Sequence, residues 1–259
     1  MDILVRYGEI GLKGKNRKFF EQCLQRNIKR FLKSKRIRHE TVIRSYNRII
    51  IENCEDFALN LNSVYGITSY SPAIRTDCSD HSIMLAIDHL LECKTFESFR
   101  ITARILDDTA KESTMEINKK FGRYVQEKYK KKVSLKEHDL NIGIEFLRGR
   151  CYVFCEKKPG PGGLPSGVSG VVKVVGTGKK SVFAAKLLMK RGCKVVFNKP
   201  ELLKDYSYGL VKKEIIKKNK EHPSAVALNT TSVKRIPPKK GFILLPLIGF
   251  AKEDIKNAL

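Results

Sequence analysis

The chain has 259 residues, of which 42% are hydrophobic, and its 51 Lys+Arg against 27 Asp+Glu give a formal net charge of +24. This length allows two or three compact domains with their own cores. No stretch reaches the roughly 20 apolar residues that a membrane helix needs, and no secretory signal precedes the first strand pattern. Seven cysteines without framework spacing exclude a disulfide scaffold and fit a reducing compartment. We therefore expect a folded, cytoplasmic protein without a membrane segment.

The large positive charge favours a phosphate polymer as partner, because a basic field attracts nucleic acid before any specific contact forms. A lysine-rich surface that is only solvated is the alternative interpretation. Here the basic residues accompany folded-domain patterns rather than a low-complexity tail. This combination favours nucleic-acid binding.

Residues 1–74 predict a first domain with the order βαββαβ. We expect strands at Asp2–Tyr7, Glu40–Ser45, Arg48–Glu52 and Ile67–Ala73, a helix at about Asn16–Ser34 and a short helix near Asp56–Leu61. Apolar residues recur at helical spacing in the longer helix, and Tyr46-Asn47 marks a tight turn between two strands. The order is that of the ferredoxin-like fold, so the N-terminal half is predicted to be of the α+β class.

Residues 75–158 predict a second domain. Its expected elements are a helix at Ser79–Leu91, a strand at Phe99–Ile105, a helix at Ser113–Tyr129, and strands at Asn141–Leu147 and Cys151–Glu156. Ser113 followed three residues later by Glu116 is a capping box, which fixes the start of the second helix. The turn Arg148-Gly149-Arg150 joins the last two strands.

The stretch 159–170 holds three prolines and five glycines in twelve residues and predicts a linker. Strands and helices then alternate in residues 171–259. We expect strands at Val171–Val175, Cys193–Phe197, Ala225–Leu228 and Phe242–Leu245, and helices at Ser181–Lys190, Tyr208–Lys218 and Lys252–Leu259. Alternation of this kind predicts a small α/β domain with a parallel sheet.

The segment from Arg6 to Arg17, RYGEIGLKGKNR, followed by Phe20-Glu21, resembles the N-terminal motif of the tRNA 4-thiouridine synthase family. It joins the first strand to a helix and gathers Lys13, Lys15, Asn16 and Arg17 at the start of that helix. Backbone N–H groups, the helix dipole and cations together favour a phosphate, so these residues are predicted to bind tRNA. A plain strand-to-helix turn with solvated lysines is the alternative.

The second domain resembles a THUMP domain through Phe99–Arg104 and Lys111–Gly122. In its known families this domain captures tRNA for an attached modifying domain. The resemblance implies that basic side chains of these stretches hold tRNA phosphates, namely Arg100, Arg104, Lys111, Lys119, Lys120 and Arg123.

The third part is similar to the ATP pyrophosphatase (PP-loop) domain of the same family through Gly162–Gly167, Ala184–Cys193 and Pro246–Ile255. The family's Ser-Gly-Gly-x-Asp-Ser loop aligns with Gly176–Ser181, which keeps Gly178 and Ser181 but has Lys180 in place of the aspartate. The resemblance implies ATP, with Mg, at the ends of the first two strands. It would lie beside Val174, Val175, Gly178, Ser181, Val196 and Phe197.

Other site types are disfavoured by the sequence. Gly176-x-Gly178-x-x-Ser181 lacks the acidic residue that a dinucleotide loop needs after the next strand, and Lys180 interrupts a P-loop. Cys151 and Cys155 are interpreted as core residues rather than metal ligands. Cys193 is also interpreted as a core residue. The family's sulfur-carrying cysteine therefore has no counterpart that we can place, and no catalytic residue is assigned.

The favoured function is participation in tRNA thiolation, with tRNA as partner and a degenerate, shortened PP-loop domain. If this domain is active, the resemblance implies uridine adenylation by ATP followed by sulfur transfer. The alternative is a non-enzymatic adaptor that presents tRNA to a separate modifying enzyme, and a third is a protein that only stabilises RNA. The resemblance also implies a sulfur donor or a separate catalytic subunit as partner, and a homodimer.

Overall fold

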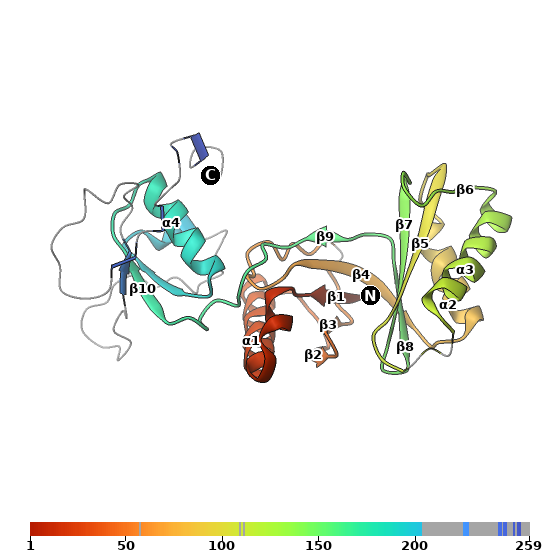
Figure 1. Ribbon diagram of the computed structural model, residues 1–259, viewed down its shortest axis with the longest axis horizontal. Helices are drawn as coiled ribbons and strands as arrows, with labels where there is room; N and C mark the ends of the chain where they lie inside the picture. Colours follow the sequence, from red (N-terminus) through yellow and green to blue (C-terminus); the bar gives the residue numbers. More distant parts are fainter. Residues whose placement is uncertain are drawn as a thin grey trace. The chain divides into compact units, whose positions relative to one another are not determined.

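The computed structural model describes residues 1–56, 58–108, 110 and 112–203, and the short stretches 225–227, 243–244, 246–247, 251 and 253–254 (Figure 1). The chain forms two compact units, each built from several segments. The first comprises Met1–Arg6, Ile37–Leu59 and Ser69–Pro159, and the second comprises Tyr7–Arg36, Asn60–Thr68 and Gly160–Leu259. In the described part of the chain, no helix is long and apolar enough to cross a membrane.

One mixed sheet runs through the first unit. Its strands are β1 (Asp2–Arg6), β2 (Thr41–Ser45), β3 (Arg48–Glu52), β4 (Ser69–Thr76), β5 (Ser98–Ile105), β6 (Lys132–Val133), β7 (Leu140–Leu147), β8 (Arg150–Phe154) and β9 (Lys158–Pro159). Their order is β2-β3-β1-β4-β8-β7-β5-β6, and β9 also pairs with β4. β4 joins the two parts of the sheet, because its residues 69–73 pair with β1 and its residues 74–76 pair with β8.

The antiparallel strands β2, β3, β1 and β4 confirm the predicted ferredoxin-like layout. All five residues of β1, including the charged Asp2 and Arg6, are buried, because β1 lies between β3 and β4 inside the sheet. The β2–β3 hairpin turns at Tyr46-Asn47, where Asn47 takes a φ of 56° that asparagine tolerates better than most residues.

The short helix predicted near Asp56–Leu61 is wrong, since the described residues of this stretch form turns and irregular backbone. The Asp56 carboxylate accepts the N–H of Ala58 at 2.9 Å, and the Asn60 side chain accepts the N–H of Asn62 at 2.9 Å. Such local bonds from Asp and Asn compete with helix formation.

Helices α2 (Asp80–Leu91) and α3 (Thr114–Tyr129) cover one face of β5, β7 and β8 (Figure 1). The predicted capping box of α3 is present, with Ser113 and Glu116 bonded to each other's backbone N–H groups. Apolar residues of both helices and of the three strands form one core. The THUMP-like half therefore has a covered face and a face without helices.

The second unit contains two 3₁₀ turns and a long helix from the N-terminal part, followed by a parallel sheet with its helix. The elements are η1 (Glu9–Leu12), η2 (Gly14–Asn16), α1 (Arg17–Lys35), β10 (Val171–Val174), α4 (Lys179–Lys190), β11 (Lys194–Phe197), η3 (Pro200–Leu203), β12 (Ala225–Ala227) and β13 (Ile243–Leu244). The sheet order is β11-β10-β12-β13, and all its pairs are parallel. This confirms the predicted α/β class of the third part.

The glycine- and proline-rich stretch 159–170 is held by hydrogen bonds within the second unit. The N–H of Gly162 donates to the Ile67 carbonyl at 2.7 Å, and that of Leu164 donates to the Lys190 carbonyl at 2.9 Å. Two of its glycines, Gly160 and Gly163, allow close approaches to the backbone of Ile67 and Lys190. The short strands β6 and β9 were not expected from the sequence. The helix expected at 208–218 lies outside the described residues, as does that at 252–259 apart from 253–254.

Candidate nucleic-acid interface

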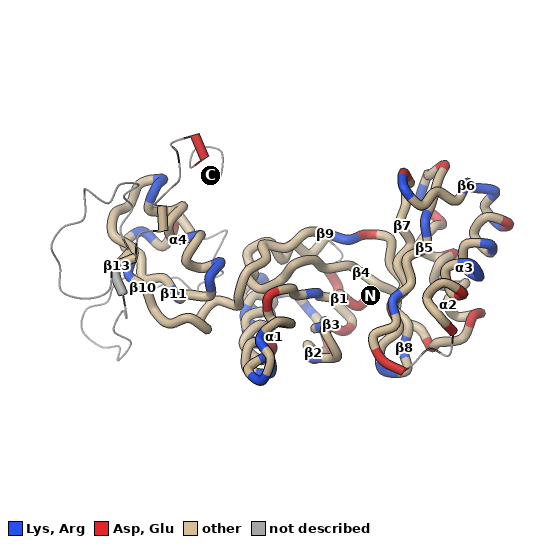
Figure 2. Tube along the Cα trace, in the orientation of Figure 1, with Lys and Arg blue, Asp and Glu red and all other residues tan. Residues whose placement is uncertain are grey.

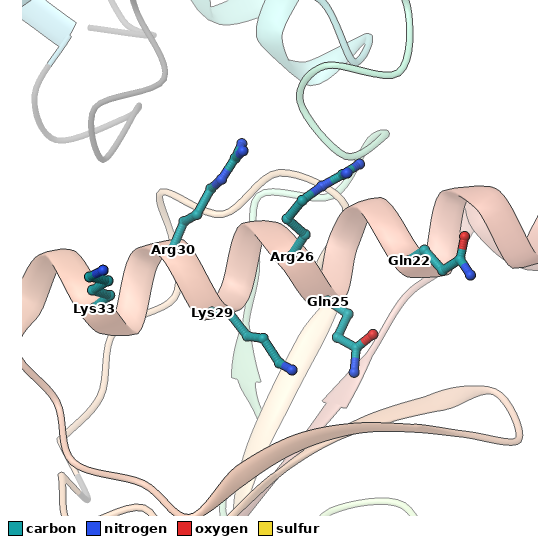
Figure 3. Close-up of a pocket in the computed structure, with 6 residues that line it drawn as sticks. All are labelled: Gln22, Gln25, Arg26, Lys29, Arg30 and Lys33. Carbon is teal, nitrogen blue, oxygen red and sulfur yellow. The ribbon is translucent and has the colours of Figure 1, made fainter.

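Helix α1 is amphipathic and carries seven basic side chains against one acidic side chain. Its buried face consists of Cys23, Leu24, Asn27, Ile28, Phe31 and Leu32. Another face presents a row that lines a shallow hollow and that we call the α1 stripe: Gln22, Gln25, Arg26, Lys29, Arg30 and Lys33 (Figure 3). The stripe extends about 16 Å along the helix axis.

The α1 stripe offers positive charge that is free for a ligand. Figure 3 shows Arg26 and Arg30 leaving the helix on one side, and Gln25 and Lys29 on the other. Lys29, Arg30 and Lys33 are exposed, and no ion pair joins them to any other described residue. Cations three and four residues apart lie on one helix face, so the stripe can follow a nucleic-acid backbone. The sequence analysis did not assign this site, although the spacing of the cations was a visible signal.

The residues predicted to bind phosphate before α1 lie on two short 3₁₀ turns and differ in their exposure. The backbone N–H of Asn16 donates to the Lys13 carbonyl at 3.0 Å, so this N–H is already bonded within the 3₁₀ turn. Lys15 and Asn16 are exposed, and Lys13 is half-buried with its Nζ 5.3 Å from the ring centroid of Phe20. The side chains of Lys13, Lys15 and Asn16 are thus within reach of a ligand.

Arg17, the fourth residue predicted there, is bound within the motif itself. Its Nε lies 2.7 Å from Glu21 Oε1, and its Nη2 donates to the Tyr7 hydroxyl at 3.2 Å. The Tyr7 hydroxyl also donates to Glu21, and burial raises the pKa of Tyr7. Arg17 therefore fastens the motif to the first turn of α1.

On α3, the two lysines predicted to bind tRNA differ in whether carboxylates of the chain pair with them. Lys119 and Arg123 are exposed, whereas Lys120 Nζ lies 2.8 Å from Asp80 Oδ2 and 2.6 Å from Glu112 Oε2. Burial lowers the pKa of Lys120, but these two hydrogen bonds outweigh it and raise the pKa. On this part of α3, Lys119 and Arg123 are therefore the cations accessible to a ligand. Lys111 lies outside the described residues.

Arg100 and Arg104 lie on the other face of the sheet from α3. Phe99, Ile101 and Ala103 pack in the core beneath α2 and α3, so the alternate residues of β5 point away from the helices. Arg100 donates to the Leu135 carbonyl at 3.4 Å, and Arg104 is exposed. The described cations of the set predicted from the THUMP resemblance are therefore split between two faces of the sheet.

A further basic patch follows α3 and was not assigned from the sequence. Lys130, Lys131 and Lys132 line a shallow hollow with Gln126 and Glu127. Figure 2 shows basic residues gathered along α1 and from the end of α3 to β6. Four lysines in the five residues 128–132 were the available signal.

The loop predicted to hold ATP follows β10, which lies between β11 and β12, where the strand order reverses. Ligands of open parallel sheets bind at the carboxyl ends of strands at such a point. Gly178 is exposed, and the space where its side chain would lie is open. This backbone, at the start of α4, fits a phosphate group.

The side chains around this loop fit ATP less well. Ser181 is fully buried, and its hydroxyl donates to the Val175 carbonyl at 3.2 Å. Val174 and Phe197 are also fully buried, in the core of the second unit, while Val175 and Val196 are half-buried. The Ser181 hydroxyl is thus already used within the fold.

The cysteines of the described residues lie mainly inside the fold. Cys193 is buried beside the Ser169 carbonyl, at 3.8 Å, and burial raises its pKa. Cys151 is in the core beneath α2 and α3, and burial raises its pKa as well. A raised pKa leaves less thiolate, the reactive form. Within the described ranges, no three His, Cys, Asp or Glu side chains are grouped as metal ligands would be.

Comparison with known proteins identifies both N-terminal domains. The family model of the ThiI ferredoxin-like domain matches residues 2–71, and that of the THUMP domain matches residues 84–156. A probable tRNA sulfurtransferase of Thermococcus kodakarensis is 35% identical over 204 residues, which cover 75% of this chain and 54% of the relative. One of Mycoplasmopsis synoviae is 38% identical over 196 residues, which cover 75% and 50%. The chain spans about half the length of these curated relatives.

Two solved structures resemble the chain. PH1313 from Pyrococcus horikoshii is 28% identical with a TM-score of 0.85, covering 99% of this chain and 97% of that one. A 4-thiouridine synthetase in a complex with RNA and bound ATP is 25% identical with a TM-score of 0.66, covering 80% of this chain and 59% of that one. The shared domains, their order and the named relatives agree: the chain belongs to the ThiI-like tRNA 4-thiouridine synthase, or tRNA sulfurtransferase, family.

Proposed function

We propose that this chain takes part in tRNA 4-thiouridine formation in the cytoplasm and binds the tRNA by its backbone phosphates. The α1 stripe carries the proposal, because it presents Lys29, Arg30 and Lys33 without competing carboxylates among the described residues. Phosphate contacts by lysine and arginine supply most of the sequence-independent affinity for nucleic acid. The relatives named tRNA sulfurtransferase and the relative crystallised with RNA support tRNA as the ligand.

Further phosphate contacts belong to the same proposal. They come from the loop before α1 and from cations of the THUMP half, of which Arg100 is half-buried and the others are exposed: Lys13, Lys15, Asn16, Arg100, Arg104, Lys119 and Arg123. Lys120 and Arg17 contribute less directly, since each is neutralised by a carboxylate of the chain. Recognition is then of shape and backbone rather than of base sequence.

Removing charge from the α1 stripe is expected to weaken tRNA binding. The variant Lys29→Gln/Lys33→Gln should lose about ten-fold in affinity, and the slope of log affinity against log salt should fall by about one to two. Fluorescence anisotropy with labelled tRNA at several salt concentrations measures both quantities.

The matched control is Lys18→Gln/Lys35→Gln, which removes the same charge from exposed positions of the same helix outside the stripe. It should retain most of the affinity. Equal losses in the two variants would mean that only the net charge matters, and the stripe would not be the site.

The contribution of the second unit decides between two forms of the function. In an active synthase, ATP with Mg would turn a uridine carbonyl oxygen into a leaving group that sulfur displaces. The open backbone at Gly178 supports this form. The second form is an adaptor that presents tRNA to a separate modifying enzyme. The buried Ser181 hydroxyl and Lys180 in the loop favour the adaptor.

ATP binding by the whole protein, with and without tRNA, separates the two forms. An active synthase should show saturable binding that Gly178→Asp abolishes by charge repulsion and Gly178→Ala retains. The alanine is a suitable control because nothing lies within 4 Å of its Cβ position. Isothermal calorimetry that detects no ATP binding beside strong tRNA binding would exclude the synthase form and support the adaptor.

A further inference from the structure

A buried cluster of charge connects β1, β3 and β7 in the first unit. Glu145 accepts a hydrogen bond from Arg6 Nε at 2.9 Å and another from Arg48 Nε at 2.7 Å. The three side chains are at most 8% exposed. Two guanidinium groups thus share one carboxylate that is almost fully shielded from solvent, and one positive charge is left over.

The hydrogen bonding of this cluster is also incomplete. Arg6 Nη1 donates to Ser71 Oγ at 2.9 Å, and Arg48 Nη1 donates to the Asn47 carbonyl at 2.7 Å. The Nη2 atom of each arginine is buried and has no hydrogen-bond partner among the described residues. Unpaired donors on buried charged groups are costly, so native proteins rarely keep them without a reason such as a ligand.

Two exposed cations stand beside the cluster. Arg104 of β5 is the register partner of Glu145, is exposed, and lies on the face of the sheet opposite α2 and α3. Lys157 is exposed and directly precedes β9, whose Lys158 pairs with Tyr70, the neighbour of the Ser71 that accepts a hydrogen bond from Arg6. Burial lowers the pKa of Lys157, and the charges of Arg6 and Arg104 lower it further. The protonated form of Lys157 is destabilised by these neighbouring positive charges, and an anion bound beside it would stabilise this form.

We infer that Arg6, Arg48, Arg104 and Lys157 form a binding site for one phosphate group on the face of the sheet opposite α2 and α3. Arg104 and Lys157 would contact the phosphate at the surface. Arg6 and Arg48 add positive potential from the interior, where it is weakly screened. The ring of Phe154, 4.6 Å from the Arg6 guanidinium carbon, forms an apolar wall beside them.

An RNA backbone phosphate and a free phosphate ion share this chemistry. The RNA backbone is the source that we propose, and for this source the inference rests on the proposed function. If the cluster only stabilised the fold, Arg6, Arg48 and Glu145 would be sufficient, and exposed cations would not be needed beside them. The exposed Arg104 and Lys157 are what make the site reachable.

The test uses the whole protein and the variant Arg104→Gln/Lys157→Gln, whose changed residues are exposed and should not affect folding. The control Arg38→Gln/Lys35→Gln removes the same charge from exposed residues that make no described hydrogen bond or ion pair with the cluster. Labelled tRNA binding is measured against salt for all three proteins. In parallel, NMR of lysine side-chain nitrogens follows the pKa of Lys157 as inorganic phosphate is added.

We expect the site variant to bind tRNA about ten-fold more weakly than the control, with a salt slope lower by about one. Inorganic phosphate should raise the pKa of Lys157. Tight tRNA binding by the wild type with no difference between the two variants would overturn the RNA phosphate site while leaving the proposed function intact. Absence of any tRNA binding by the wild type would instead contradict the proposed function. No response of Lys157 to phosphate would overturn the anion site itself.

Discussion

Replacing Glu145 with glutamine is expected to lower the free energy of unfolding of the first unit by about 3–5 kcal/mol, the cost of removing one partner of a buried ion pair. The carboxylate neutralises Arg6 and Arg48 and accepts from the Nε of both. A glutamine amide has one accepting oxygen, and its NH₂ group would face a guanidinium donor. The variant would keep two buried cations with no counter-charge.

Urea denaturation followed by circular dichroism measures this loss in the full chain. The control is Glu137→Gln, because Glu137 is exposed and should change stability by about 0.5 kcal/mol or less. A loss below about 1 kcal/mol for Glu145→Gln would contradict the role of the carboxylate as the counter-charge of the cluster.

The same residue predicts a pH dependence. Burial by itself raises the pKa of Glu145, but the hydrogen bond and charge of Arg48 and the charge of Arg6 outweigh it and hold the pKa below its ordinary value of 4.5. A lowered pKa in the folded state means that the stabilisation is complete above pH 4.5 and is lost as the pH falls toward the folded pKa. The difference in stability between wild type and Glu145→Gln should therefore narrow in acid.

Local patterns in the sequence predicted much of the fold. The capping box of Ser113 and Glu116 and the turn at Asn47 depend on residues within a few positions of one another, so the sequence displays them directly. The helix near Asp56–Leu61 failed for a local reason as well. The βαββαβ order suggested a helix here, but the side chains of Asp56 and Asn60 bond to nearby backbone and stabilise turns.

The partners of the charged residues could not be predicted in this way. Arg6 and Glu145 are 139 positions apart, and Lys120 and Asp80 are 40 positions apart. Lys119 and Lys120 look alike in the sequence, yet only the second has its charge neutralised by the fold. Whether a lysine is free for phosphate depends on contacts that only the tertiary structure creates.

The division of the THUMP cations between two faces was partly visible. In the segment from Phe99 to Arg104, apolar and polar residues alternate, which places Arg100 and Arg104 together on one face of a strand. The sequence does not reveal which face the helices cover. That requires the core formed by α2 and α3 with β5, and it separates these arginines from Lys119.

Gly163→Ala is expected to lower the free energy of unfolding of the second unit by about 2–4 kcal/mol, from backbone strain and overpacking together. Gly163 has a φ of 75°, and a Cβ there would lie 2.1 Å from the Lys190 carbonyl oxygen. That oxygen also accepts the N–H of Leu164 at 2.9 Å, so it cannot move away without breaking this bond. Denaturation by urea, followed by circular dichroism, measures the loss.

The neighbouring Gly162 supplies a control that separates the two causes. Its φ of 67° is equally unfavourable for alanine, but the nearest atom to its Cβ position is the flexible Cε of Lys190, at 3.9 Å. Gly162→Ala should therefore cost about 1 kcal/mol, for the left-handed backbone alone. The excess loss in Gly163→Ala then measures how closely the stretch 159–170 is fixed against the end of α4. Equal losses in the two variants would mean that the Lys190 carbonyl yields, and that this contact does not hold the stretch in place.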